Sequence, residues 1–260
     1  HRLFRCGFRV VMTDLDRPTA VRRTVSFGSA IRDHEIEIEG VRGVAHRLDQ
    51  AEALVQFDWS HIPVFVDPTC GLRACWRPDV IIDARIAKSN LDNGRDDAEL
   101  VIGLGPGLEA GRDVHYVVET HRGHHLGRII ARGTAASNTG RPGEISGFTH
   151  ERVLTAPFAG VFESHQTIGS LVKVGDIIGE VARERVSTGI SGVISAEISG
   201  VVRGLLVSGS EVASRQKLGD IDPRGDPTFC YTLSDKGRTI RGSVLEIVVR
   251  HVRTKPQPTP

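Results

Sequence analysis

The stretch that decides the fold runs from Val101 to Gly147 and reads VIGLGPGLEAGRDVHYVVETHRGHHLGRIIARGTAASNTGRPGEISG. Its many glycines, two prolines and four histidines surround polar residues that follow no amphipathic period. Glycine accepts positive φ and leaves free the space of a Cβ, so this composition is typical of loops that approach a ligand. The pattern before the stretch is α/β and the pattern after it is all-β. We therefore predict the working site at this junction.

Composition excludes several classes of protein. The 33 basic and 32 acidic residues leave a net charge of +1, without the basic excess of a nucleic-acid binder. No apolar run reaches the length that crosses a bilayer, so we expect no membrane partner. The spacing of the four cysteines fits neither a zinc ribbon nor a disulfide framework. We predict a cytoplasmic protein with reduced thiols.

The segment before residue 101 predicts a Rossmann-like parallel sheet. Continuous apolar strands at 63–67 and 80–83 alternate with helical segments such as 47–57, which indicates helices on both faces of the sheet. A strand over 9–13 ends at Asp14, which can bind a ribose or simply cap the next helix. The first strand and the glycine loop of such a unit would precede His1.

Ligands of parallel sheets lie beyond the carboxyl ends of the strands, which places Asp14, Asp83 and Lys88 at the functional edge. The strand at 101–102 runs into a glycine loop whose backbone amides can cradle an anion, although the loop lacks the lysine of a Walker motif. We predict that the following residues bind the ligand together with that edge: Gly103, Gly105, Gly107, Arg122, Asn138, Thr139 and Gly140.

The histidines of the stretch suggest catalysis more than metal binding. His124 follows Glu119 closely, which suits a general acid–base pair or, equally, a structural hydrogen bond. His124 and His125 are adjacent, and adjacent side chains on a strand point to opposite faces. No HExxH pattern is present, so we expect no metal.

After residue 156 the sequence repeats with an ungapped offset of 40 residues. Gly160 matches Gly200, Gly179 matches Gly219, and Val172 matches Val212. Such a repeat predicts two copies of one β unit about a pseudo-twofold axis. The strings APFAGVF (156–162) and IGSLVKVGDIIGEV (168–181) resemble the barrel-sandwich hybrid of biotinyl and lipoyl domains. The joining segment, 182–195, contains no lysine, so we expect no biotin or lipoate and a docking or shielding role.

These patterns predict a fold of α/β plus all-β class. An α/β Rossmann-like domain over 1–150 would be followed by a barrel-sandwich hybrid over 151–225. An extension over 226–260 would pack back on the α/β part and end in a proline-rich tail.

Several strings resemble the selenium-dependent molybdenum hydroxylase system protein family (YqeB type). They are GFRVVMTDLDRPTAVRRTVSF (7–27), PDVIIDARIAK (78–88), VIGLGPGLEAGRDVHYVVETHRGHHLGR (101–128), NTGRPGE (138–144) and LGDIDPR (218–224). The resemblance implies a cytoplasmic accessory factor in the maturation of molybdenum hydroxylases, with a Rossmann-like N-terminal part.

Three hypotheses follow. In the first, the protein binds a small-molecule ligand with a phosphate, such as a nucleotide or molybdopterin, in a cleft between the α/β and β parts. In the second, it is an enzyme that processes a selenium or phosphate compound, with His124 and Glu119 as acid–base pair. In the third, it is a structural adaptor that docks a client molybdenum hydroxylase. A homo-oligomer is compatible with each.

Overall fold

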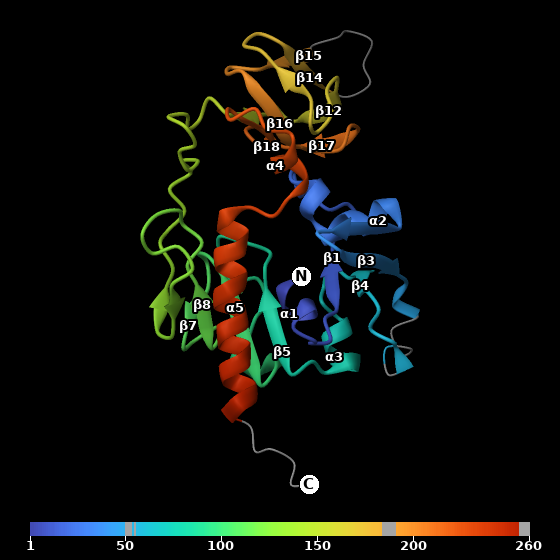
Figure 1. Ribbon diagram of the computed structural model, residues 1–260, viewed down its shortest axis with the longest axis vertical. Coiled ribbons are helices and arrows are strands. Elements are labelled where there is room, and N and C mark those ends of the chain that lie inside the picture. The colour runs from blue at the N-terminus through green and yellow to red at the C-terminus, as the bar shows by residue number, and fades with distance from the viewer. Residues whose placement is uncertain (50–53, 55, 184–190, 255–260) are drawn as a thin grey trace.

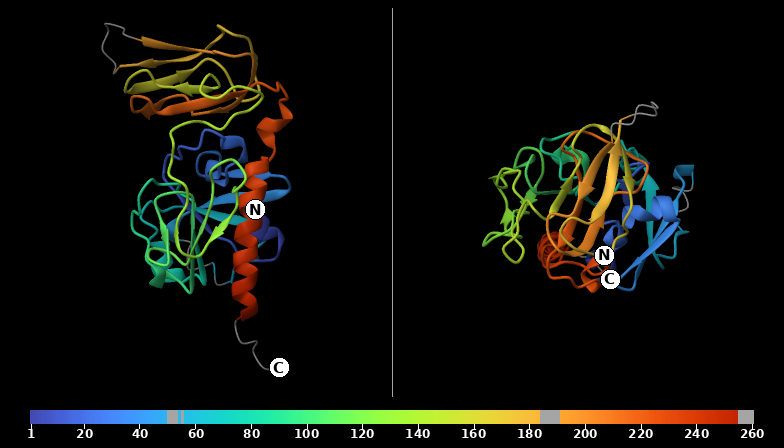
Figure 2. Two further views of the ribbon diagram at one scale, coloured as in Figure 1. Left: turned by 90° about the vertical axis from the view of Figure 1, so that its left-hand side faces the viewer. Right: turned by 90° about the horizontal axis from the view of Figure 1, so that it is seen from above.

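The computed structural model describes residues 1–49, 54, 56–183 and 191–254. Within these residues the strands form four four-stranded sheets and one two-stranded sheet. Two of the four-stranded sheets lie side by side in the lower part of Figure 1, and the other two form the upper part. Figure 2 shows the upper sheets stacked above the rest of the chain. Among the described residues, no helix is both long and apolar enough to cross a membrane.

The first sheet has the order β1-β4-β3-β2 and is mixed. Its strands are β1 (Met12–Asp14), β2 (Glu35–Ile38), β3 (Val41–His46) and β4 (Ile62–Val66). β4 is parallel to both neighbours, whereas β2 and β3 form an antiparallel hairpin. Glu39 and Gly40 make the hairpin turn with φ values of 44° and 76°. Two successive positive φ values are the signature of a tight hairpin turn that matches the twist of its strands.

The second sheet has the order β5-β6-β8-β9, and its first three strands are parallel. Its strands are β5 (Val80–Asp83), β6 (Leu100–Leu104), β8 (Tyr116–Val118) and the antiparallel edge β9 (Ile129–Ile130). Beside it, β7 (Glu109–Ala110) pairs with β10 (Gly133–Thr134). β6 is buried over nearly its whole length because side chains cover both of its faces.

Helix α5 (Asp235–Thr254) covers one face of the second sheet (Figures 1 and 2). Its buried residues Val244, Ile247 and Val248 recur at helical spacing and pack against β6 and β8. The other helices are single turns: α1 (Arg2–Arg5), α2 (Ala30–Asp33), α3 (Leu72–Trp76), α4 (Thr228–Tyr231) and 3₁₀ turns at Arg23–Val25, Phe27–Ser29 and Arg95–Asp97.

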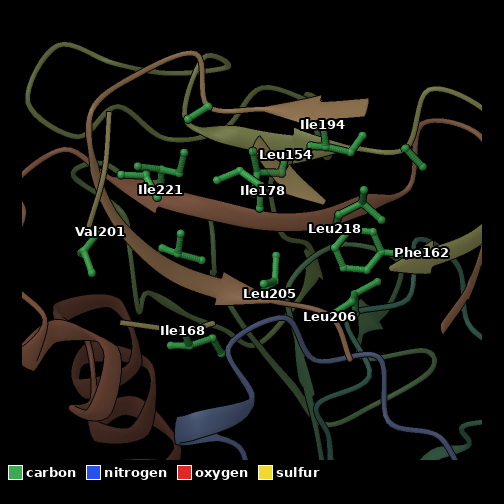
Figure 3. Close-up of a cluster of buried hydrophobic side chains, with 14 of the residues drawn as sticks. Leu154, Phe162, Ile168, Ile178, Ile194, Val201, Leu205, Leu206, Leu218 and Ile221 are labelled. Carbon is green, nitrogen blue, oxygen red and sulfur yellow. The ribbon is translucent and has the colours of Figure 1, made fainter. Parts of the chain in front are cut away.

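The upper part consists of two antiparallel sheets, which we call the paired sheets. One has the order β11-β18-β16-β13, with β11 (Val153–Thr155), β18 (Lys217–Asp222), β16 (Gly200–Leu205) and β13 (Leu171–Val172). The other has the order β15-β14-β12-β17, with β15 (Ser191–Ser195), β14 (Ile177–Ala182), β12 (Gly160–Ser164) and β17 (Ser210–Val212). Their apolar side chains share one core (Figure 3).

The positions of these strands follow the 40-residue spacing of the sequence. β12 and β16 begin at Gly160 and Gly200, and β14 and β18 begin at Ile177 and Lys217. A Cβ on Gly160 would lie 2.9 Å from the carbonyl carbon of Ala182, and one on Gly200 would lie 2.9 Å from that of Asp222. Each glycine therefore permits the same close backbone approach in its own sheet.

Main-chain and arginine contacts join the paired sheets to the rest of the chain. The Leu205 N–H donates to the Val21 carbonyl, and Arg23 Nε donates to the Leu205 carbonyl at 3.0 Å. Arg152 donates to the Gly143 carbonyl at 3.0 Å. These contacts fix the paired sheets above the lower sheets.

The predicted fold class, a Rossmann-like sheet followed by a barrel-sandwich hybrid, is wrong. The parallel strands do not form one sheet with helices on both faces, because β4 pairs with β1 and β3 while β5 pairs with β6 in a separate sheet. The described residues instead form several small sheets with few long helices. The predicted helix over 47–57, the joining segment 182–195 and the tail at 255–260 lie partly or wholly outside the described residues.

Candidate functional site

A pocket opens at the carboxyl edge of the second sheet, where the loops after β5 and β6 meet the segment after β10. Its volume is about 320 Å³. We call it the crevice pocket, and its lining residues are Lys88, Pro106, Gly107, Thr134, Ala135, Ser137 and Asn138. Ligands of parallel sheets commonly bind in such a position, because loops from neighbouring strands diverge there.

The glycines at the end of β6 and in the loop after it are explained by packing of the chain against itself. Gly107 has a φ of 101°, and a Cβ there would lie 2.7 Å from the Lys88 carbonyl carbon and 2.7 Å from Ser89 N. A Cβ on Gly105 would lie 2.6 Å from Thr120 Oγ1, and one on Gly103 would lie 2.5 Å from a methyl carbon of Leu108. The close approach that glycine permits here therefore brings the 87–89 backbone, and with it Lys88, against the loop.

A network of charged and amide groups fixes the loop that carries Lys88. Arg85 Nη2 binds Asp83 Oδ2 at 2.7 Å and Asp92 Oδ1 at 2.6 Å. Asn93 Nδ2 donates to the same Asp83 oxygen at 2.5 Å. Burial of Asp83 opposes its ionisation, but the hydrogen bonds from Arg85 and Asn93 outweigh burial and lower its pKa. Asp83 is thus a structural anchor, and its carboxylate does not line the pocket.

Glu119 holds the opposite wall of the pocket in place. Its side chain is buried, and its two oxygens accept hydrogen bonds from His121 N and Ala136 N, each at 2.7 Å. Ala136 lies between the lining residues Ala135 and Ser137. Glu119 therefore positions the pocket wall, and both of its oxygens are occupied by backbone donors.

The polar groups that line the pocket have unused hydrogen-bonding capacity. Among the described residues, no hydrogen bond or ion pair engages the Lys88 ammonium or the hydroxyls of Thr134 and Ser137. Asn138 Oδ1 accepts a hydrogen bond from Gly140 N at 3.0 Å, which leaves the Asn138 amide group free to donate. The pocket thus presents one positive charge and several neutral hydrogen-bonding groups.

Three of the predicted ligand-binding residues, Lys88, Gly107 and Asn138, meet at this pocket. Gly103 and Gly105 do not line it, and Thr139 and Gly140 continue along the exposed chain after Asn138. Thr139 Oγ1 accepts a hydrogen bond from Arg141 N at 3.2 Å.

The other predicted site residues lie elsewhere. Asp14 ends β1 in the first sheet and accepts a hydrogen bond from Leu15 N. Arg122 pairs with Asp235 on α5. His124 is exposed beside His125, with ring centroids 5.0 Å apart, and no hydrogen bond among the described residues joins it to Glu119. The structure therefore does not assemble the expected acid–base pair.

The sequence interpretation missed Thr134 and Ser137. Thr134 belongs to β10, a two-residue strand opposite β7, and strands this short leave no periodic signal.

Within the described part of the chain, no group of three or more His, Cys, Asp or Glu side chains is placed to hold a metal ion.

Comparison with solved structures finds desuccinylase and aspartoacylase proteins. An aspartoacylase family protein from Mesorhizobium loti is 19% identical, with a TM-score of 0.26 over 35% of this chain and 27% of that one. A succinylglutamate desuccinylase from Silicibacter is 13% identical, with a TM-score of 0.27 over 50% of this chain and 45% of that one. Similarity at this level assigns neither a fold nor an activity to this chain.

In sequence, the chain is similar to Uncharacterized protein YqeB of Escherichia coli (strain K12). The two are 44% identical over 250 residues, which cover 95% of this chain and 44% of the relative. The chain thus spans less than half the length of that relative. No family model matches the chain.

The predicted role in maturation of selenium-dependent molybdenum hydroxylases is withdrawn, together with its variants as a selenium-processing enzyme or a client adaptor, because nothing in these comparisons supports it. The similar sequence carries no functional name. The shared strings support similarity to YqeB and nothing more specific.

Proposed function

We propose that the protein binds a small hydroxylated acid with one negative charge in the crevice pocket. The observation that carries this proposal is the unpaired Lys88 ammonium facing a pocket that also has the hydroxyls of Thr134 and Ser137. A single ammonium balances one carboxylate, and the neutral groups suit hydroxyls of the ligand.

The size of the pocket supports a small ligand. Its volume of about 320 Å³ lies at the lower end of the range for ligand sites, roughly 300–1,000 Å³. Hydroxy acids and sugar acids combine this size with one charge and several hydroxyls. A reducing compartment such as the cytoplasm suits this function, since all four cysteines are free thiols.

A thermal-shift screen tests the proposal. Lactate, glycerate, threonate and gluconate are compared with the neutral compounds glycerol and glucose at equal concentration and ionic strength. A ligand that binds only the folded state raises Tm, and it stabilises the protein by about 2.7 kcal/mol at 100 times its Kd. We expect at least one hydroxy acid to raise Tm and the neutral compounds to leave it unchanged.

Matched variants connect the effect to the pocket. Lys88→Met removes the charge, so it should abolish the Tm rise while leaving the Tm of the free protein nearly unchanged. Lys173→Met is the control, because Lys173 is an exposed lysine of the paired sheets. The proposal is wrong if no acid raises Tm, or if Lys88→Met responds to the acid as fully as Lys173→Met does.

A further inference from the structure

Two histidines of the first sheet meet end to end outside the crevice pocket. His46 ends β3 and lies in register with Phe65 near the end of β4, while His61 directly precedes β4. Their Nε2 atoms are 3.0 Å apart, and their ring planes differ by 12°. The ring centroids are 5.3 Å apart, so the imidazoles meet at their Nε2 edges and do not overlap face to face.

The far side of the His61 ring is held by a hydroxyl and a carboxylate. Ser60 Oγ lies 3.2 Å from His61 Nδ1 and donates its own hydrogen to Asp58 Oδ1 at 2.9 Å. Because the Ser60 hydrogen points to Asp58, His61 Nδ1 must be the donor to Ser60 Oγ. His61 Nε2 therefore carries a lone pair directed at His46. Metal-binding histidines are oriented in the same way, by a hydrogen bond from the nitrogen that does not bind the metal.

The surroundings favour the neutral form of both rings. Phe57 packs edge-on against both imidazoles, with centroid distances of 5.7 Å to His46 and 4.8 Å to His61. Burial lowers the pKa of His46, and burial together with the neighbouring His46 lowers the pKa of His61. Neutral imidazole is the form that binds transition metals.

We propose that His46 and His61 bind one divalent transition-metal ion through their Nε2 atoms. Two nitrogens bound to one tetrahedral Zn²⁺ at 2.0–2.1 Å lie about 3.3 Å apart, so the ion is admitted when the rings separate by about 0.3 Å and each ring rotates by about 35° to turn its Nε2 lone pair toward the ion. The hydrogen between the two Nε2 atoms moves to His46 Nδ1, and both rings remain neutral. Water completes the coordination.

The ligand type sets the choice of ion. Imidazole nitrogens favour Zn²⁺, Ni²⁺ and Cu²⁺ over Mg²⁺ and Ca²⁺, and Cu²⁺ should bind most tightly. With two protein ligands the site is open to exchange, and we expect micromolar affinity.

The tryptophans of the chain provide a local reporter. The sequence contains two tryptophans, and both belong to the same aromatic cluster. Trp59 lies 5.2 Å from the Phe57 ring and 6.1 Å from Trp76. Paramagnetic Cu²⁺ or Ni²⁺ bound at the histidine pair should therefore quench the intrinsic tryptophan fluorescence.

The experiment titrates tag-free protein with Cu²⁺ and Ni²⁺ and then competes the bound ion with Zn²⁺. We expect saturable quenching at one equivalent that excess Zn²⁺ reverses. His46→Gln and His61→Gln should each weaken the apparent affinity at least tenfold. The control is the double variant His124→Gln/His125→Gln, which removes two adjacent, exposed histidines of the loop after β8. This variant should leave the affinity unchanged.

A second measurement covers the case in which the histidine variants fail to fold. Electron paramagnetic resonance of the Cu²⁺ complex of the unmodified protein should show coupling to two imidazole nitrogens. Absence of saturable quenching, equal quenching in properly folded His46→Gln, loss of quenching in the control, or coupling to fewer than two nitrogens overturns the proposal. In those cases the two histidines share a proton without binding a metal.

Discussion

Arg122 and Asp235 form a two-pronged ion pair that joins the loop after β8 to the first turn of α5. Arg122 Nη1 lies 2.7 Å from Asp235 Oδ2, and Nη2 lies 3.0 Å from Oδ1. The stem of Arg122 also packs on Gly143, where a Cβ would lie 2.5 Å from Arg122 Cδ. Asp235 stands at a helix N-terminus, where a negative charge is favourable. One side chain thus connects three segments that are distant in the sequence.

Asp235→Asn should lower stability slightly and in a pH-dependent way. The hydrogen bond from Arg122 lowers the pKa of Asp235 from 3.8 to about 2. Since the folded pKa is below the unfolded one, the stabilisation is complete above pH 3.8 and is lost as the pH falls toward 2. Solvent screens the pair because 69% of the Asp235 side chain is exposed. We therefore expect Asp235→Asn to lower the free energy of unfolding by about 0.5 kcal/mol at pH 7.

Urea denaturation of the wild type and of Asp235→Asn at pH 7 and pH 3 checks this expectation. The difference between the two proteins should be smaller at pH 3. A difference that grows on acidification would show that another group dominates.

Glu119→Ala should destabilise the crevice pocket more than the rest of the fold. The substitution removes the acceptors of two backbone N–H groups and leaves a void at a side chain that is buried. We expect Glu119→Ala to lower the free energy of unfolding by about 2 kcal/mol. Glu119→Gln should lower it less, because the glutamine keeps one carbonyl acceptor.

Hydrogen exchange of residues 134–138 and chemical denaturation measure this effect. Exchange should accelerate in the segment around Ala136, whose N–H loses its acceptor. Glu144→Ala is the control, because Glu144 is an exposed carboxylate that lies close to the pocket wall in the sequence. If Glu119→Ala accelerated hydrogen exchange equally along the whole chain, the role of Glu119 in positioning the pocket wall would be contradicted.

The sequence predicts individual strands better than their assembly. The strands expected at 63–67 and 80–83 are β4 and β5, and the apolar run of β4 is buried whereas that of β5 is half-buried. Strand pairing is non-local, however, and similar apolar runs do not specify which strand lies beside which. β4 pairs in register with Met12–Asp14 on one side and Gly43–His46 on the other, and nothing in its own sequence indicates this.

The site shows the same limit. Lys88 and Gly107 could be placed together because both follow apolar strands of a parallel pair. Arg122 looked available for a ligand, but its partner Asp235 is 113 residues away in the sequence. Glu119 looked catalytic, but its carboxylate satisfies backbone donors that only the folded loops bring near. A polar residue in a loop therefore does not reveal whether its partner is a ligand or the chain itself.

Asp222→Ala should be among the most destabilising single substitutions. Asp222 is fully buried and binds Arg203 Nη1 at 3.1 Å and Arg224 Nη2 at 2.6 Å. Removal of the carboxylate leaves the buried Arg203 guanidinium without this partner. Breaking a buried pair in this way costs about 3–5 kcal/mol. Glu246→Ala, which breaks an exposed pair with Arg250 on α5, should cost about 0.3–0.5 kcal/mol.

The pH dependence of stability provides an independent check on Asp222. Burial alone would raise its pKa, but the hydrogen bonds from Arg224 outweigh burial, and the folded pKa lies below the usual value of 3.8. Its stabilisation is therefore present above pH 3.8 and declines as the pH falls through the lowered value. The difference in free energy of unfolding between wild type and Asp222→Asn should shrink as the pH is lowered from 7 to 3, and a constant difference would contradict this assignment.

Gly160→Ala and Gly200→Ala should have similar costs, because the two glycines occupy corresponding positions in the paired sheets. At each position, an added Cβ would lie 2.9 Å from the carbonyl carbon of a residue in the neighbouring strand. Main chain within a sheet cannot move aside as a flexible side chain does. We expect each substitution to destabilise the protein by about 1–3 kcal/mol through overpacking. Gly237→Ala on α5 is the control, since its nearest neighbour would be Ser234 Oγ at 3.6 Å and alanine is the better helix former. Guanidinium denaturation of the three variants and of the Gly160→Ala/Gly200→Ala double variant measures the costs. A large cost at Gly160 with none at Gly200 would show that the two sheets tolerate this contact differently despite their common strand spacing.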